Sequence, residues 1–217
     1  MNYPDPALFV PLIFAITVFP IALVMVTSYT KIVVVLSLLK NALGLQQVPP
    51  AMVTNGLALV LSWYVMYPVG IQVVDSIELE QQRPKASQNL TVLGIYEFAK
   101  APMRAFLDKH AKPHERVFFM DAARRLMGEK FAATVTETDF VVLVPAFAIS
   151  ELTDAFLIGV VIALPFIVID LLVANVLMAL GMQMMSPTMI ALPVKLLLFV
   201  MLDGWSRLAH ALVLTYR

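Results

Sequence analysis

Residues 178–193 read MALGMQMMSPTMIALP, and they join two long apolar segments at residues 140–180 and 190–216. Gly181 and the pair Ser186-Pro187 are residues of the kind that mark turns. Five methionines crowd this turn, where a hairpin between two lipid-compatible segments would normally be polar: Met178, Met182, Met184, Met185 and Met189. The stretch therefore predicts a helical hairpin with an apolar tip.

The methionines at this tip have two interpretations. Methionine is unbranched and polarizable, so it fills irregular gaps in a core and also repacks against changing partners. Core packing is the ordinary role of such a cluster. The position at a turn, rather than along one helical face, favours a second role, in which a ring of tips from several subunits closes a hole and reopens around different cargo.

The composition places the chain in a membrane. Of its 217 residues, 60% are hydrophobic and 14% are charged, and the mean hydropathy is +0.86. A soluble domain carries about 25% charged residues. The net charge is zero, which gives no electrostatic basis for binding nucleic acid. The chain has no cysteine, so it has no disulfide and no thiolate metal site.

Sequence motifs of enzymes are also missing. No nucleotide-binding, zinc-protease or serine-hydrolase pattern occurs in the chain. Residues 1–11 lack the Lys or Arg of a secretory signal peptide, so we expect the first apolar segment to be kept in the mature protein. We expect a protein that is not an enzyme and needs no cofactor.

The apolar segments are too long for simple membrane spans. As single helices, residues 7–39 would be about 50 Å long and residues 140–180 about 60 Å, whereas the hydrocarbon core is about 30 Å thick. The first segment must therefore tilt, kink near Pro20, or run partly outside the bilayer. Residues 51–74 form the second segment, and residues 190–216, with Pro193 in the first turn, form the fourth.

The expected fold is all-α and membrane-associated. A hydrophobic helical hairpin at residues 1–75 and a second one at 140–217 flank a polar helical insert at 76–139. Residues 75–139 hold ten acidic and ten basic side chains, two thirds of all the charges. Amphipathic spacing predicts insert helices at 91–109 and 115–127.

The insert is expected to present a solvated surface. Its charges are balanced, which favours a water-facing role over a catalytic one. His110 and His114 lie four residues apart, but Pro113 falls between them and no third ligand is near, so we reject a metal site there. The insert is also too long for its charge to decide the side of the membrane on which it lies.

Six charged residues interrupt the apolar segments: Lys31, Glu151, Asp154, Asp170, Lys195 and Asp203. A charge in hydrocarbon costs on the order of 3 kcal/mol by insertion scales, so each needs a partner or water. Lys31 and Lys195 are the only cations well inside apolar runs and are the natural partners of the carboxylates. We expect buried ion pairs that fix how segments or subunits dock; a proton or ion relay and the lining of a wet passage remain alternatives.

Motifs in both hydrophobic halves occur in a specific order. They include Thr27-Ser28-Tyr29-Thr30-Lys31, Asn41-Ala42-Leu43-Gly44, Gln46-Gln47-Val48-Pro49-Pro50, Pro145-Ala146-Phe147, Ser150-Glu151-Leu152, Leu164-Pro165-Phe166, Met178-Ala179-Leu180-Gly181-Met182, Leu192-Pro193-Val194-Lys195 and Leu202-Asp203-Gly204-Trp205. With these motifs the chain resembles the FliP/SctR family, core export-apparatus proteins of flagellar and virulence-associated type III secretion. The resemblance covers residues 20–75 and 140–217, and the turn at residues 46–50 looks more like the virulence-associated branch.

The resemblance implies an assembly and a site. Members form about five copies in a helical export gate with FliQ/SctS-like and FliR/SctT-like subunits, next to SctU/FlhB-like and SctV/FlhA-like export components. Their helices lie largely on the periplasmic side of the bacterial inner membrane, which would resolve the length problem. The methionine gasket of the family maps to Met182, Gln183, Met184 and Met185, and its intersubunit ion pairs map to Lys31, Glu151 and Lys195.

The gasket motif departs from the family at one position. Members usually read Gly-Met-Met-Met, whereas this chain has Gln183 in the middle and a methionine at 185. A glutamine in the seal would hydrate it, so we expect Gln183 to turn toward a neighbouring backbone. The hypothesis for the whole chain is a pore subunit for export of unfolded proteins; an ion-coupled secondary transporter and a non-conducting membrane scaffold are the alternatives.

Overall fold

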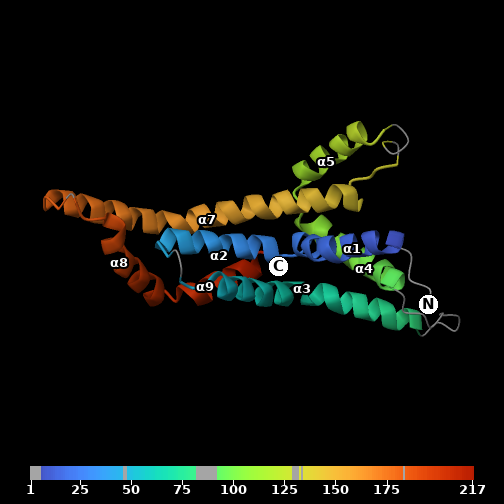
Figure 1. The fold of residues 1–217 in the computed structure, drawn as a ribbon, viewed down its shortest axis with the longest axis horizontal. Coiled ribbons are helices and arrows are strands. Elements are labelled where there is room, and N and C mark those ends of the chain that lie inside the picture. The colour runs from blue at the N-terminus through green and yellow to red at the C-terminus, as the bar shows by residue number, and fades with distance from the viewer. Residues whose placement is uncertain (1–5, 46–47, 82–91, 129–131, 133, 183) are drawn as a thin grey trace. The chain divides into compact units, whose positions relative to one another are not determined.

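The computed structural model describes residues 6–45, 48–81, 92–128, 132, 134–182 and 184–217. Over these ranges the regular elements are helices, and none of the described residues forms a strand, which confirms the all-α prediction (Figure 1). The helices are α1 (Pro6–Met25), α2 (Tyr29–Leu43), α3 (Ala51–Gln81), α4 (Val92–His110), α5 (Pro113–Leu126), α7 (Phe140–Ala179), α8 (Pro187–Met201) and α9 (Gly204–Leu214).

The chain forms two compact units. The first unit comprises Met1–Thr30 and Val69–Ser150, and the second comprises Lys31–Pro68 and Glu151–Arg217. The three boundaries between them fall inside α2, inside α3 and inside α7. The polar insert belongs to the first unit, and the methionine-rich turn belongs to the second.

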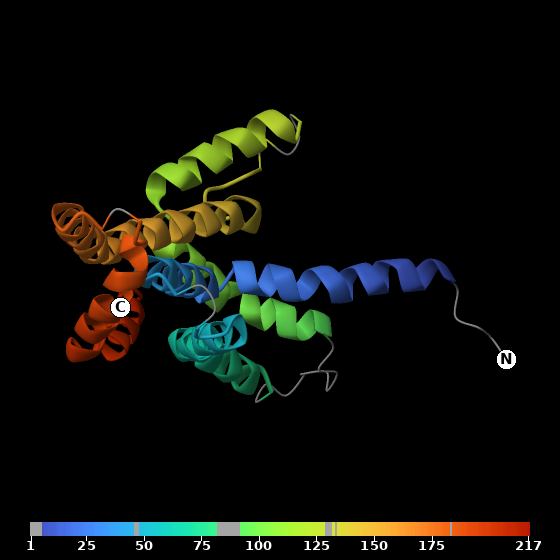
Figure 2. The same cartoon turned by 60° about the vertical axis from the view of Figure 1, so that its left-hand side comes forward.

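The first unit has its core where the insert packs on the beginning of α7. Phe106 of α4 lies against Phe147 of α7, with 5.6 Å between the ring centroids. Ala123 of α5 packs with Val142 of α7 and with Val135 in a second buried cluster. The predicted insert helices at 91–109 and 115–127 are α4 and α5, which a corner at residues 111–112 joins (Figure 2). Residues 83–89, RPKASQN, have a sequence typical of a loop, and they lie outside the described residues.

The break in the first apolar segment does not occur at Pro20. Helix α1 continues through Pro20 and ends at Met25. The Thr27 and Thr30 hydroxyls both donate to the Val24 carbonyl, at 3.1 and 3.3 Å, and the Tyr29 amide donates to Thr27 Oγ1 at 3.4 Å. Side-chain hydroxyls therefore satisfy the backbone groups that the end of a helix leaves unpaired.

The second unit contains the hairpin of α7 and α8. As predicted, α7 is one helix of 40 residues, about 60 Å long, and it continues through Pro145 and Pro165. Helix α8 begins at Pro187, a position where the backbone amide would have no partner within the helix, so proline is tolerated there. Because the helix begins this early, Pro193 lies inside it and not, as the sequence had suggested, in its first turn.

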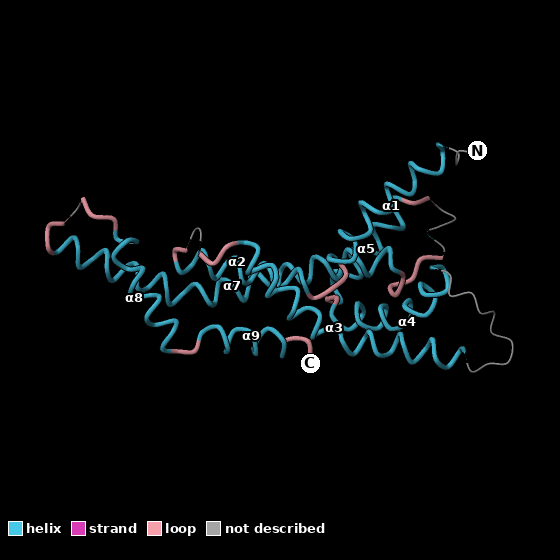
Figure 3. The backbone as a smooth tube through the Cα atoms, turned by 60° about the horizontal axis from the view of Figure 1, so that its bottom comes forward, coloured by secondary structure: helices cyan, strands magenta, loops and turns pink. Residues whose placement is uncertain are grey.

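The last apolar segment is not one helix. It divides into α8 and α9, which differ in direction by 63° (Figure 3). Asp203 at the break has φ +51°, in the left-handed region. A Cβ on Gly204 would lie 2.2 Å from the Phe199 ring, so only glycine allows the chain to turn this closely.

Packing in the second unit joins four helices. Leu39 and Leu43 of α2, Phe166 of α7 and Phe199 of α8 form a buried cluster, and Leu208 of α9 lies against it. Close approach of α2 and α7 depends on Gly159, because a Cβ there would lie 2.2 Å from Leu38 Cδ1.

Two helical stretches, Ala51–Leu79 and Phe140–Ala179, are long and apolar enough to cross a membrane. The count of such stretches in the described part of the chain rises to at most four if each bent pair of helices is one span. The length and apolar composition of these helices indicate a membrane protein. Most of their side chains are not buried within the chain.

Candidate functional site: buried charges and an exposed methionine tip

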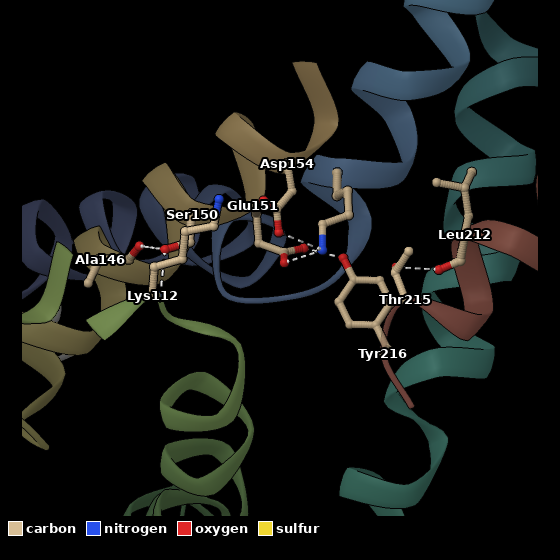
Figure 4. A network of polar contacts seen from close by, with 9 residues as sticks. Lys112, Ala146, Ser150, Glu151, Asp154, Leu212, Thr215 and Tyr216 are labelled. Atoms are coloured by element: carbon tan, nitrogen blue, oxygen red, sulfur yellow. Dashed lines mark hydrogen bonds and ion pairs between the residues drawn. The ribbon is translucent and has the colours of Figure 1, made fainter. Parts of the chain in front are cut away.

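A cluster of charges lies inside the second unit where α2, α7 and the segment after α9 meet (Figure 4). We call Lys31, Glu151, Asp154 and Tyr216 the charge cluster. Lys31 Nζ lies 2.7 Å from Glu151 Oε1 and 3.7 Å from Asp154 Oδ2. The Tyr216 hydroxyl donates to Glu151 Oε2. Lys31 and Glu151 are 3% and 0% exposed, so protein groups replace water around both charges.

A second ion pair lies farther along the hairpin. Lys195 Nζ of α8 lies 2.6 Å from Asp170 Oδ2 of α7, and it also donates to the Ala42 carbonyl at 3.1 Å. Lys195 is 3% exposed, whereas the Asp170 side chain is 31% exposed. Ala42 lies in the last turn of α2, where helical carbonyls lack intrahelical donors, so the ammonium satisfies a backbone acceptor as well as a carboxylate.

The end of α2 is closed by the backbone around Gly44. The Leu45 amide donates to the Lys40 carbonyl and the Gly44 amide donates to the Asn41 carbonyl, both at 3.0 Å. With Gly44 at φ +81° this is a Schellman motif, which terminates the helix next to the Lys195 contact.

Three of the charged residues have surroundings in the single chain that the sequence did not specify. Within the chain Lys195 pairs with Asp170 and not with Glu151. Asp203, which we expected to be buried, is exposed because it occupies the break between α8 and α9 rather than the middle of an apolar helix. Asp154 is partly exposed, with 33% of its side chain accessible.

Tyr216 is a member of the charge cluster that sequence reasoning missed. It is 9% exposed, and burial, with a smaller contribution from the Glu151 charge, raises the pKa of its phenol well above the usual range. A phenol with a raised pKa keeps its proton and remains a donor. The available signal was its place next to the last apolar segment, where an aromatic with one polar atom can close a buried polar site.

The methionine tip has the opposite environment. Its described methionines are exposed: Met178 58%, Met182 41%, Met184 102%, Met185 45% and Met189 73%. They therefore do not fill the core of their own chain. Gln183 lies outside the described residues, so the expected orientation of its side chain stays a prediction.

The backbone of the tip is ordered by hydrogen bonds. The Met182 amide donates to the Leu177 carbonyl at 2.9 Å, and the Gly181 amide donates to the Met178 carbonyl at 3.0 Å. Gly181 has φ +73°, so α7 ends in a second Schellman motif. The arrangement presents flexible apolar side chains on a defined turn.

Histidines of the insert do not gather with other ligands. Among the described residues there is no group of three or more His, Cys, Asp or Glu side chains that could hold a metal ion. His110 stacks on Phe106 with 4.8 Å between ring centroids, and His114 Nε2 lies 3.4 Å from Glu115 Oε1.

Comparison with known proteins identifies the family. The sequence matches the FliP family over residues 12–212. The hypersensitivity response secretion protein HrcR of Ralstonia nicotianae is 49% identical over 203 residues, 94% of each chain. The Yop proteins translocation protein R of Yersinia pestis is 45% identical over 216 residues, 100% of this chain and 99% of the relative. The flagellar biosynthetic protein FliP of Bacillus subtilis is 38% identical over 210 residues, 95% of this chain and 91% of the relative. The chain therefore belongs to the FliP family.

Proposed function

We propose that this protein is a pore subunit of a type III protein-secretion apparatus, through which unfolded proteins leave the bacterial cell. Family membership supports a secretion role, because relatives from both virulence and flagellar systems carry secretion, translocation or flagellar names. In this role the chain is a structural part of a conduit and carries out no catalysis. Identities of 49% to HrcR of Ralstonia nicotianae and 45% to the Yop translocation protein of Yersinia pestis, against 38% to the flagellar relative, support the virulence-associated branch.

The observation that carries the proposal is the exposed methionine tip between two apolar helices. A pore for proteins must close against ions and still widen for chains with any side chain. Branched aliphatic residues have few rotamers and would form a stiff ring, whereas charged residues would hydrate the opening. Exposed methionines meeting on an axis would close the opening without a fixed shape, and an apolar constriction can exclude ions by dewetting.

The exposed apolar surface of the second unit supports assembly into an oligomer. Large apolar side chains along α7 are exposed in the single chain, including Leu157, Leu164 and Leu171. Such surface needs lipid or other subunits. We propose that about five copies, together with FliQ/SctS-like and FliR/SctT-like subunits, cover it, in contact with SctU/FlhB-like and SctV/FlhA-like components.

Intersubunit ion pairing of Lys31, Glu151 and Lys195 is part of this proposal. All three have partners within the chain, so contacts between subunits would add to these pairs. Asp170 can take part in such a contact through the accessible part of its side chain, which is 31% exposed.

Conductance tests the gate. Replacing Met182, Met184 and Met185 together with Ala should make the resting assembly leak small ions in planar bilayers, while the subunit count stays the same. The matched control replaces two exposed methionines away from the tip, Met52 and Met201, which are 86% and 73% exposed. A tightly closed triple variant would show that the gate lies elsewhere, and an assembly that never conducts would favour the scaffold.

Thiol labelling tests the periplasmic placement of the insert. The chain has no cysteine, so Lys109→Cys, at an exposed position in the last turn of α4, introduces a single reactive site. A membrane-impermeant thiol reagent should label it in intact spheroplasts. Labelling only after lysis would place the insert on the cytoplasmic side.

A further inference from the structure

Tyr216 contacts both charges of the buried pair with different parts of one side chain. Its hydroxyl donates to Glu151, and the face of its ring lies under the Lys31 ammonium, with 4.4 Å between Nζ and the ring centroid. A phenol combines an O–H donor, which suits an anion, with a negative ring face, which suits a cation.

The charge balance explains why Glu151 requires this second donor. One ammonium, that of Lys31, faces two carboxylates, those of Glu151 and Asp154. Asp154 is partly exposed and is also solvated by water, whereas Glu151 is 0% exposed and depends on protein donors. A buried carboxylate that lacks donors is costly, so the Tyr216 hydroxyl stabilises the ionised pair.

Local structure after α9 directs Tyr216 inward. Thr215 Oγ1 donates to the Leu212 carbonyl at 2.7 Å, and the Tyr216 amide donates to the Val213 carbonyl at 3.2 Å. Leu212, one helical turn earlier, is 1% exposed and anchors the same face of α9. Hydrogen bonds therefore tie Thr215 and Tyr216 back to the last turn of α9. From this turn the Tyr216 phenol reaches Glu151 (Figure 4).

We propose that Tyr216 is a positioning residue that completes the Lys31–Glu151 pair and so locks α2, α7 and the end of α9 together within a single chain. This inference concerns how the subunit holds its own shape, and it does not depend on the methionine gate. Because all the contacts lie within the chain, the lock forms in a subunit that has not assembled.

The test uses the full chain alone in detergent and measures its unfolding equilibrium. Tyr216→Phe keeps the ring over Lys31 and removes the donor to Glu151, so the unfolding equilibrium constant should rise about tenfold or more. Tyr216→Leu also removes the ring and should raise it further. The control Tyr64→Phe removes a phenol hydroxyl from a residue that is 68% exposed in the same unit and should leave the constant unchanged.

A double-mutant cycle separates positioning from general packing. In the Glu151→Leu background no side-chain acceptor remains at position 151 for the Tyr216 hydroxyl, so Tyr216→Phe should no longer raise the unfolding constant by more than threefold. An equal loss in both backgrounds, or no loss in the parent chain, would overturn the proposal. If Tyr216→Phe does not accumulate in the membrane, the amount of the double variant decides: an amount no lower than that of Glu151→Leu supports the lock, and a further loss overturns it.

Discussion

The charge cluster and the methionine tip both include part of α7 and lie in the same unit, but they are built in opposite ways. Around Glu151 the side chains are buried and their polar atoms have defined partners, including Lys31 and Tyr216. At Met184 and its neighbours the side chains are exposed, and the defined contacts are those of the backbone turn. The difference separates two requirements of the proposed pore: a subunit must hold one shape where its helices join, and its tip must accept many shapes if it meets cargo there.

The largest effect is expected at the charge cluster. Glu151→Ala leaves the Lys31 ammonium buried without its nearest partner, and removing one member of a buried pair costs about 3–5 kcal/mol. Assembly and secretion should be lost, as measured by recovery of the intact oligomer and by export of a reporter protein.

Glu137→Ala is the control for this change. Glu137 is an exposed carboxylate of the insert, so its loss should leave assembly intact. If Glu151→Ala assembled and secreted like the parent, the buried pair would not matter and the contrast between the two regions would disappear.

A smaller effect is expected at the second ion pair. Asp170→Asn keeps the shape of the side chain but removes the charge opposite Lys195, which retains the Ala42 carbonyl. Leaving a buried group poorly satisfied costs about 1–3 kcal/mol. Thermal unfolding of the chain in detergent measures the loss, and a stability equal to that of the parent would show that water satisfies Lys195 equally well.

The turn between α8 and α9 should tolerate no side chain. Gly204→Ala places a Cβ against the Phe199 ring, and overpacking of this kind costs about 1–3 kcal/mol. Gly56→Ala is the matched change inside α3, where a Cβ meets nothing within 4 Å. It should stabilise the helix by about 0.5–1 kcal/mol, so denaturation of the two variants should shift in opposite directions.

The smallest effect on stability is expected at the tip. Met184 is fully exposed in the single chain, so Met184→Ala should move the unfolding midpoint by no more than about 2 °C. Leakage of the assembled pore should nevertheless increase. A large loss of stability in the isolated chain would show that the tip packs as core, like the charge cluster.

Sequence patterns predicted the elements that local chemistry dictates. Gly181 and Pro187 marked the turn between α7 and α8, and the apolar run at 140–180 marked the segment that forms one long helix. The helix after the turn begins at Pro187, three residues before the expected segment at 190–216. The break at Asp203 was missed, although Asp203-Gly204 is a pair that is typical of turns and aspartate tolerates the left-handed region. The close contact between Gly204 and the Phe199 ring exists only after folding and could not be predicted.

The pairing of the charges was predicted only in part. Sequence identified Lys31, Glu151 and Lys195 as residues that need partners, because isolated charges stand out in apolar runs. It did not predict Asp170 as the partner of Lys195, although the two lie at similar sequence distances from the turn, as residues facing each other across a hairpin must. Nor did the sequence predict that Tyr216 joins the cluster, because nothing in the sequence shows which acceptor a tyrosine hydroxyl will bind.

The end of α7 extends past the helix that supports it. Ile169 packs against the buried cluster of α2, α7 and α8, and the last ten residues of α7, about 15 Å of helix, continue beyond α2 to the turn (Figure 1). The backbone at this end is held by the Schellman motif of the final turn, whereas the torsions of the methionine side chains are soft. In the proposed pore, variation in the width of a passing chain would therefore fall on the methionine side chains. The seal would then close again on the timescale of rotamer changes, without a helix having to move.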